Sequence, residues 1–243
     1  MDTSSNPALS NKAFARFDTS EQVDTMSVGG TLLKTGLAFI VLLAAGAWGW
    51  TLFPQFGSTI PWWVMWVGVG ATLAVGFWAV FNANVINVLL YAALEGVYLG
   101  IISRSLETWY NGIVTQAIVL TLAITLGMFF LYATKIVKIS KKFYSVMLIA
   151  TLGVLIYLVA EFLLALIIPG FSNLVLSGPL GIIIALVIVF IAALNLLLDF
   201  DTISRGVQNK LSKKAEWYGA FGLMVTLIWL YVSILRLLAA TRR

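Results

Sequence analysis

The sequence predicts an all-α integral membrane protein with seven transmembrane helices. Of its 243 residues, 61% are hydrophobic and only 10% are charged, whereas soluble domains carry about 25% charged residues. The mean hydropathy is +1.00. Seven apolar stretches, each long enough to cross a bilayer, fill most of the chain between Thr31 and Leu238. We therefore expect one membrane domain, residues 31–240, embedded in the lipid bilayer.

A polar segment of mixed charge, residues 1–30, precedes this domain. It contains no apolar run of the kind found in a cleavable signal peptide. We expect a flexible cytoplasmic tail, with the first span acting as the uncleaved insertion signal.

The first four spans are separated by turn-forming residues. Pro54 and Gly57 follow the first span, Asn82–Asn84 separates the second from the third, and Asn111-Gly112 separates the third from the fourth. The expected ranges are residues 31–53, 62–81, 84–103 and 113–134.

The last three spans follow the same rule. Pro169-Gly170 ends the fifth span and Gly178-Pro179 opens the sixth. The stretch from Trp217 to Ala240 is long enough to cross the bilayer as the seventh. Tryptophan and tyrosine gather near the span ends, as expected at membrane interfaces. The expected ranges are residues 143–168, 177–200 and 216–239.

The distribution of lysine and arginine predicts a cytoplasmic amino terminus. With that orientation eleven basic residues lie inside: Lys12, Arg16, Lys34, Lys135, Lys138, Lys141, Lys142, Arg205, Lys210, Lys213 and Lys214. Four lie outside: Arg104, Arg236, Arg242 and Arg243. The basic carboxy terminus would fit better if the last stretch were re-entrant, which leaves a six-span alternative open. We prefer seven spans.

The absence of cysteine and histidine excludes several kinds of chemistry. Zinc and haem sites built from these residues are ruled out, as are nucleophiles activated by histidine. We expect no enzymatic activity and no cofactor. The basic residues sit in short loops beside spans, where membrane topology explains them, so we expect no nucleic-acid partner.

Glu95 lies about halfway along the third span. A charged residue at the centre of a membrane helix costs about 2.5–3.5 kcal/mol, so such residues are candidates for function. The carboxyl must face a cavity, pair with a cation or be protonated. A neutral acid that bridges two helices is the alternative. Gly96 and Gly100, spaced four residues apart, predict close approach of a neighbouring helix.

Four further ionisable residues lie at or near membrane depth. Glu161 could pair with Arg236 if the fifth and seventh spans touch, either as a structural or as a gating ion pair. Asp199 and Asp201 end the sixth span. On a helix they point about 200° apart, so at most one faces the bundle. We expect Asp199 to be interfacial, and Glu216 as well, where it suits the dipole of the last helix.

Five segments carry recognisable motifs: Leu94–Gly100 (LEGVYLG), Leu198–Ile203 (LDFDTI), Glu216–Leu223 (EWYGAFGL), Ser5–Leu9 (SNPAL) and Trp229–Arg236 (WLYVSILR). The first three resemble the Bax inhibitor family, the transmembrane BAX-inhibitor-motif proteins. The last two look like its bacterial branch. Together they cover essentially the whole chain.

The resemblance implies a seven-helix fold in which the last helix is central and the other six surround it. It also implies a pH-sensitive calcium leak channel, and animal relatives suppress cell death. In that family an aspartate ending the sixth helix shares a proton with one in the seventh, and this pair gates the pore. Asp201 matches the first partner, and Glu95 matches the acid of the family's Glu-Gly motif.

The second partner of that pair is missing. No acid occurs after Glu216, and Thr226 or Leu230 stands near the matching position. Asp199 or Glu216 would have to substitute for the missing acid. Helix geometry makes the first substitution awkward.

Two hypotheses follow. The first is a cation leak pathway in a bacterial inner membrane, with calcium bound transiently, Glu95 lining the pore and Asp201 responding to pH at the cytoplasmic end. Calcium or another cation would then be the partner. The second is a non-conducting protein that regulates a membrane protease or another membrane protein in a stress response. In that case the acids are structural and the tail is the docking element.

Overall fold

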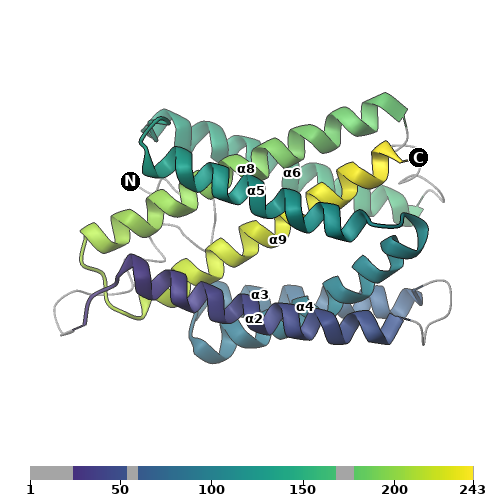
Figure 1. Cartoon of the computed structure of the whole chain (residues 1–243), viewed down its shortest axis with the longest axis horizontal. Coiled ribbons are helices and arrows are strands. Elements are labelled where there is room, and N and C mark those ends of the chain that lie inside the picture. Colours follow the sequence, from purple (N-terminus) through teal and green to yellow (C-terminus); the bar gives the residue numbers. More distant parts are fainter. Residues whose placement is uncertain (1–23, 54–59, 168–177, 243) are drawn as a thin grey trace.

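A computed structural model describes residues 24–53, 60–167 and 178–242 of the protein. Residues 1–23 of the predicted tail, and the turn residues Pro54, Gly57, Pro169 and Gly170, lie outside these ranges. Within them the chain is all-helical (Figure 1). The helices are α2 (Val28–Leu52), α3 (Trp62–Phe81), α4 (Val85–Trp109), α5 (Ile113–Ala133), α6 (Lys141–Ile167), α8 (Gly178–Gln208) and α9 (Ala215–Thr241).

These seven helices correspond one to one with the seven predicted spans. Six of them are long and apolar enough to cross a membrane, and α3 contributes a shorter apolar stretch, Trp66–Phe81. The last of the six, α9, is one uninterrupted helix of 27 residues. Its continuity favours the interpretation of the last stretch as a full span rather than a re-entrant segment.

Polar residues set the starts of several helices. Ser27 caps α2 by accepting a hydrogen bond from the Gly30 amide, and Asn84 caps α4 by accepting one from the Asn87 amide. Gly112, with a left-handed φ of 77°, turns the chain into α5. These caps explain why the predicted turns lie where the helices begin.

Two predicted helix ends were wrong. The third span was expected to end at residue 103 and the sixth at residue 200, but α4 continues to Trp109 and α8 to Gln208. Charged residues at the membrane surface do not break a helix. Arg104 stays helical and places its guanidinium over the Trp50 ring, and Arg205 pairs with a carboxylate one turn earlier.

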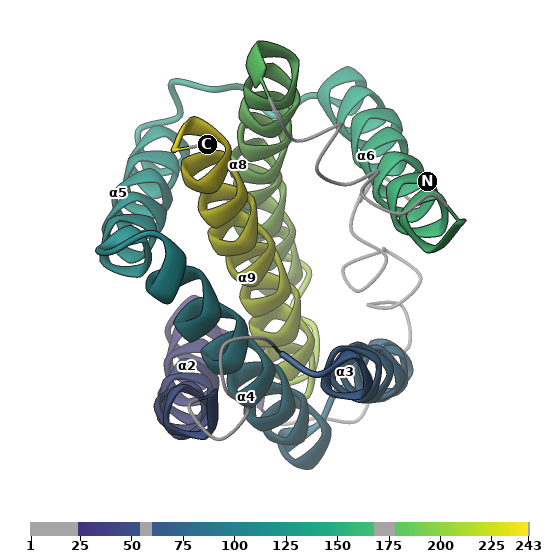
Figure 2. The ribbon, with the colours of Figure 1, turned by 90° about the vertical axis from the view of Figure 1, so that its right-hand side faces the viewer.

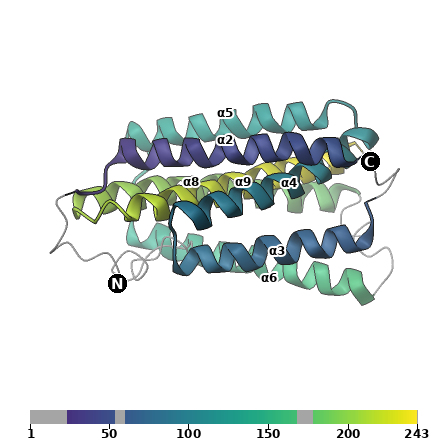
Figure 3. The same ribbon diagram turned by 90° about the horizontal axis from the view of Figure 1, so that it is seen from below.

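The most extensive helix pairs are α2 with α4 and α8 with α9. Helix α9 packs against α8, α2, α5 and α4, whereas α3 packs mainly on α4 and α6 mainly on α8. Figure 2 and Figure 3 show α3 and α6 on one side of α9, and α2 and α5 on the other. The core is apolar and includes Phe221, Met224, Leu230 and Ile234 of α9.

The interface between α2 and α4 confirms the predicted close approach at the glycines of the third span. A Cβ atom at Gly96 would overlap the Leu42 carbonyl oxygen, and one at Gly100 would overlap the Gly46 carbonyl oxygen. In return, a Cβ at Gly49 of α2 would overlap the backbone of α4. The two helices therefore meet backbone to backbone, which only residues without side chains permit.

Candidate functional site

Glu95 faces α3 from the middle of α4. Its carboxyl has the Thr72 side chain of α3 as a hydrogen-bonding partner. Ion pairs among the described residues include Glu161, Asp201 and Glu216, but none of the ion pairs found in those ranges involves Glu95. Glu95 is therefore an acid within a span whose partner in the described part of the chain is a hydroxyl.

Two tyrosines flank Glu95 on the same face of α4, Tyr91 one turn before it and Tyr98 about one turn after it. Glycines of α3 make room for both rings. A Cβ at Gly68 would overlap the Tyr98 ring, and one at Gly76 would press against the Tyr91 ring. The Tyr91 ring also packs edge-on against Phe221 of α9, with ring centroids 5.2 Å apart. The acid thus lies between two aromatic rings at the α3–α4 contact.

Asp201 bonds to a phenol and a guanidinium at the end of α8. Tyr144 of α6 donates its hydroxyl to Asp201 Oδ2, and Arg205 Nε lies 2.6 Å from the same oxygen. The Arg205 guanidinium lies over the Tyr144 ring at 5.1 Å. In the described part of the chain, the partners of Asp201 are thus a base and a phenol instead of a second carboxyl. The i, i+4 spacing could have revealed Arg205, but no sequence signal points to Tyr144.

Asp199 and Asp201 point to different surroundings, as their spacing predicts. Asp199 does not end a helix, contrary to the expected end of the sixth span. Asp199 is 1% exposed, whereas the Asp201 side chain is 16% exposed. The reason is the length of α8, which runs two more turns beyond these residues. Asp199 therefore lies inside the bundle and not at a helix end.

Helix α9, which lacks the acid expected as the partner of Asp201, passes close to Asp199. A Cβ at Gly219 of α9 would contact Ile203 of α8, so one turn further along the antiparallel pair Asp199 is level with Leu223. Thr226 is buried on the next turn and donates its hydroxyl to the Gly222 carbonyl at 3.2 Å.

Leu230, the other residue near the matching position, is fully buried and apolar. The region of α9 that faces the middle of α8 therefore offers a hydroxyl and apolar side chains.

Glu161 and Arg236 form an ion pair between α6 and α9. The Arg236 guanidinium donates to Glu161 Oε1 at 2.5 Å, and Glu161 is 6% exposed. The Tyr157 side chain, one turn before Glu161 on α6, is a further hydrogen-bonding partner of Glu161. Because α6 packs mainly on α8, this pair is a separate link between α6 and the last helix.

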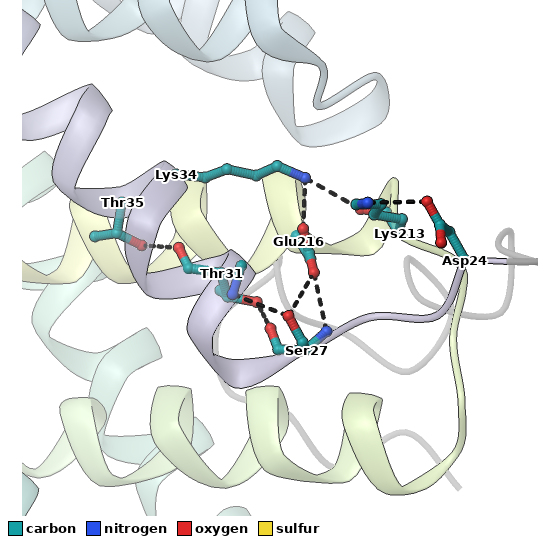
Figure 4. Close-up of polar contacts among 8 residues, drawn as sticks. Asp24, Ser27, Thr31, Lys34, Thr35, Lys213 and Glu216 are labelled. Carbon is teal, nitrogen blue, oxygen red and sulfur yellow. Dashed lines mark hydrogen bonds and ion pairs between the residues drawn. The ribbon is translucent and has the colours of Figure 1, made fainter.

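Glu216 lies in the first turn of α9, where its expected interaction with the helix dipole is possible, and it is buried against α2. It is 1% exposed and holds three donors (Figure 4). Its Oε1 accepts from the Ser27 amide at 2.9 Å and from Ser27 Oγ at 3.0 Å, and its Oε2 lies 2.6 Å from Lys34 Nζ. A Cβ at Gly30 would overlap the carboxylate. Glu216 joins the first turn of α9 to the start of α2.

Sequence reasoning missed two buried polar pairs between helices. Asn195 of α8 donates to Thr151 Oγ1 of α6 at 3.0 Å, and Ser103 of α4 bonds to the Tyr231 hydroxyl of α9 at 2.8 Å. A threonine or serine in an apolar run carries no signal for its partner, because the pairing depends on which helices meet.

The family of the protein follows from its similarity to known sequences. The family described as Bax inhibitor 1 like matches residues 6–243, nearly the whole chain. No curated protein and no solved structure gives a significant match. The match covers all the motif segments except the first residue of Ser5–Leu9, and the all-helical bundle of long apolar helices agrees with it. The chain belongs to the Bax inhibitor 1 like family.

Proposed function

We propose that this protein is a pH-sensitive cation leak channel of a bacterial inner membrane, with Ca²⁺ as the cation. Glu95 lines the pathway and Asp201 responds to pH at its cytoplasmic end. Membership of the Bax inhibitor 1 like family supports the proposal. The amino terminus is cytoplasmic, α3 crosses the membrane with the other six helices, and α9 is the central helix around which they pack.

The observation that carries the proposal is the position of Glu95. It lies halfway along α4, and its partner in the described part of the chain is the Thr72 hydroxyl. A carboxylate at this depth attracts a cation, and Ca²⁺ prefers oxygen ligands. Protonation removes the charge, so flux falls when the carboxyl is neutral.

The test is calcium flux into proteoliposomes over a range of pH. We expect flux in the wild type and a clear loss in Glu95→Gln, and we expect Asp201→Asn to shift the pH dependence. Glu107→Gln is the matched control. Glu107 lies at the α4–α5 turn, away from the proposed pathway, and its two oxygens accept hydrogen bonds from the Gly112 and Val114 amides. Glutamine removes the charge and keeps one of these two acceptor oxygens. Flux unchanged in both Glu95→Gln and Asp201→Asn would refute the assignment of these residues.

The orientation in the membrane can be tested in the same chain. It contains no cysteine, so single cysteines report which side of the membrane a loop faces. Cysteines at Lys138 and Lys210 should react with an impermeant maleimide added from the cytoplasmic side. A cysteine at Asn111 should react from the other side. The reverse pattern would contradict the proposed orientation.

A second function, a non-conducting regulator of a membrane protease or stress response, is favoured by a different observation. Asp201, Glu161 and Glu216 each have a basic partner, as acids with a purely structural role would. The flux assay separates the two functions. Absence of flux in every preparation, together with crosslinking of the tail to another membrane protein, would support the regulator.

A further inference from the structure

Residues Asp24–Ser27, the strap, cross the turn between α8 and α9. The Met26 amide donates to the Leu211 carbonyl at 2.7 Å, and the Lys213 amide donates to the Asp24 carbonyl at 3.2 Å. Thr25 therefore lies opposite Ser212 as an antiparallel bridge. The segment that connects the tail to α2 is thereby attached to the hairpin formed by the last two helices.

Met26 fills a socket at the base of that hairpin. Its side chain is 2% exposed. A Cβ at Gly206 of α8 would press against its sulfur, and one at Gly219 of α9 would contact its methyl group. The two glycines leave the volume that the flexible methionine side chain occupies. A residue close to the tail is thus packed between the end of α8 and the start of α9.

The strap has an outer part and an inner part of different strength. On the outside, Lys213 Nζ pairs with Asp24 at 2.9 Å, and both side chains are exposed (Figure 4). The hydrogen bond that Lys213 Nζ donates to the Asp24 carboxylate raises the pKa of the Lys213 amine. Exposed pairs of this kind are weak and screened by salt. On the inside, Ser27 is bonded to the buried Glu216 carboxylate, which Lys34 also binds.

Because the inner contacts are the stronger ones, detachment of the strap from the α8–α9 turn would stop at Ser27. Residues Asp24–Met26 can lift off the α8–α9 turn while the joint between Ser27 and Glu216 stays closed. With the strap docked, Asp199 of α8 is buried within the bundle.

We propose that the strap is an autoinhibitory contact that holds the α8–α9 hairpin against α2 and keeps the pathway shut. Release of Asp24–Met26 frees the hairpin and raises cation flux. The gating role rests on the proposed channel function. Through the strap, whatever pulls on the tail acts on the helix that carries Asp199 and Asp201.

A disulfide between residues 25 and 212 tests the docked state. Thr25 and Ser212 form a non-hydrogen-bonded antiparallel pair, because the two backbone hydrogen bonds are made by their neighbours. Such pairs have Cα atoms about 4.5 Å apart, which is within disulfide range. The native chain has no cysteine to interfere. The calcium flux of the double variant Thr25→Cys/Ser212→Cys is measured in proteoliposomes with the disulfide formed and again after its reduction. Thr25→Cys alone, given the same treatments, is the control.

Two further variants test release. Met26→Ala empties the socket, and Asp24→Asn weakens the outer pair without touching the core. We expect Met26→Ala to raise flux by about fivefold or more, the population change that roughly 1 kcal/mol of lost docking produces. Asp24→Asn should raise it less, and the oxidised double cysteine should conduct no more than the wild type. The proposal is overturned if Met26→Ala, Asp24→Asn and both states of the disulfide variant all show the same flux as the wild type.

Cysteine labelling tests release of the strap independently of the proposed channel function. Ser212 is buried beneath the strap, so a cysteine at this position should react slowly with a soluble maleimide and faster when Met26→Ala is added. Equal rates would overturn release of the strap even if the protein conducts. If no variant conducts, the channel proposal and the gating role fall together, and faster labelling would still support a releasable strap.

Discussion

The Lys34–Glu216 pair provides the sharpest test of what holds this bundle together. Lys34→Met keeps the length of the side chain and removes the charge 2.6 Å from Glu216 Oε2. Glu216 is fully buried and Lys34 is 16% exposed. Water can therefore do little to replace the lost ammonium group, and the carboxylate is left inside the protein without its cation.

The expected cost follows from that burial. Removing one partner of a buried ion pair costs about 3–5 kcal/mol. Two hydrogen bonds from Ser27 and the amino-terminal dipole of α9 still favour the carboxylate, the dipole by about 0.3–1 kcal/mol. We therefore expect Lys34→Met to lower the free energy of unfolding by about 2–4 kcal/mol.

A second substitution separates the stranded charge from lost packing. Glu216→Gln in the Lys34→Met background removes the charge and keeps an oxygen for the Ser27 donors. The double variant should regain stability, with a coupling energy of at least about 1 kcal/mol between the two sites.

Equilibrium unfolding in mixed micelles with increasing sodium dodecyl sulfate, followed by far-UV circular dichroism, measures these differences. Lys214→Met, which changes an exposed lysine in the turn before α9, is the control and should be neutral. The reasoning is refuted if Lys34→Met stays within about 0.5 kcal/mol of the wild type. It is also refuted if the double variant is no more stable than Lys34→Met alone.

Three further predictions use the same unfolding assay. Gly100→Leu should destabilise by at least about 1–3 kcal/mol, because its side chain would enter the α2 backbone, whereas Gly36→Leu should be neutral because nothing lies within 4 Å of its Cβ position. Arg236→Met should cost about 3 kcal/mol by stranding the buried carboxylate of Glu161, and Glu161→Gln added to it should restore part of that loss. Tyr144→Phe should cost about 1 kcal/mol through the lost hydrogen bond to the α8 carboxylate, and a change below about 0.3 kcal/mol would contradict that bond.

Most of the fold could be predicted from the sequence because the membrane imposes a simple rule. An apolar stretch must form a helix long enough to satisfy its own backbone in lipid, and prolines, glycines and asparagines mark the turns. The two misplaced helix ends, of α4 and α8, came from ending each span just before a charged residue, Arg104 after the third span and Asp201 after the sixth. Length in the membrane and length of the helix are different quantities when a helix projects into water.

The candidate site was less predictable, for a reason that individual residues make plain. The Asp201–Arg205 pair lies within one turn of helix and could be derived from spacing. The opposite orientations of Asp199 and Asp201 could also be derived, but which one faces inward depends on where α8 ends. The partners of Glu95, Asp201 and Glu216 on other helices depend on which helices meet, and no periodicity within one helix contains that information.

The Lys34–Glu216 ion pair between α2 and α9 has a consequence for the order in which the chain is synthesised and assembled. Lys34 and Glu216 are separated by 182 residues, and Lys34 lies in the first span while Glu216 opens the last. At a synthesis rate of about 5–20 residues per second, the lysine emerges roughly 10–40 seconds before its partner. During that interval the first span carries an unmatched cation at the membrane surface. The Lys34–Glu216 pair can therefore form only after the first turn of α9 has been synthesised, and a polypeptide truncated before α9 would retain a lysine without its partner.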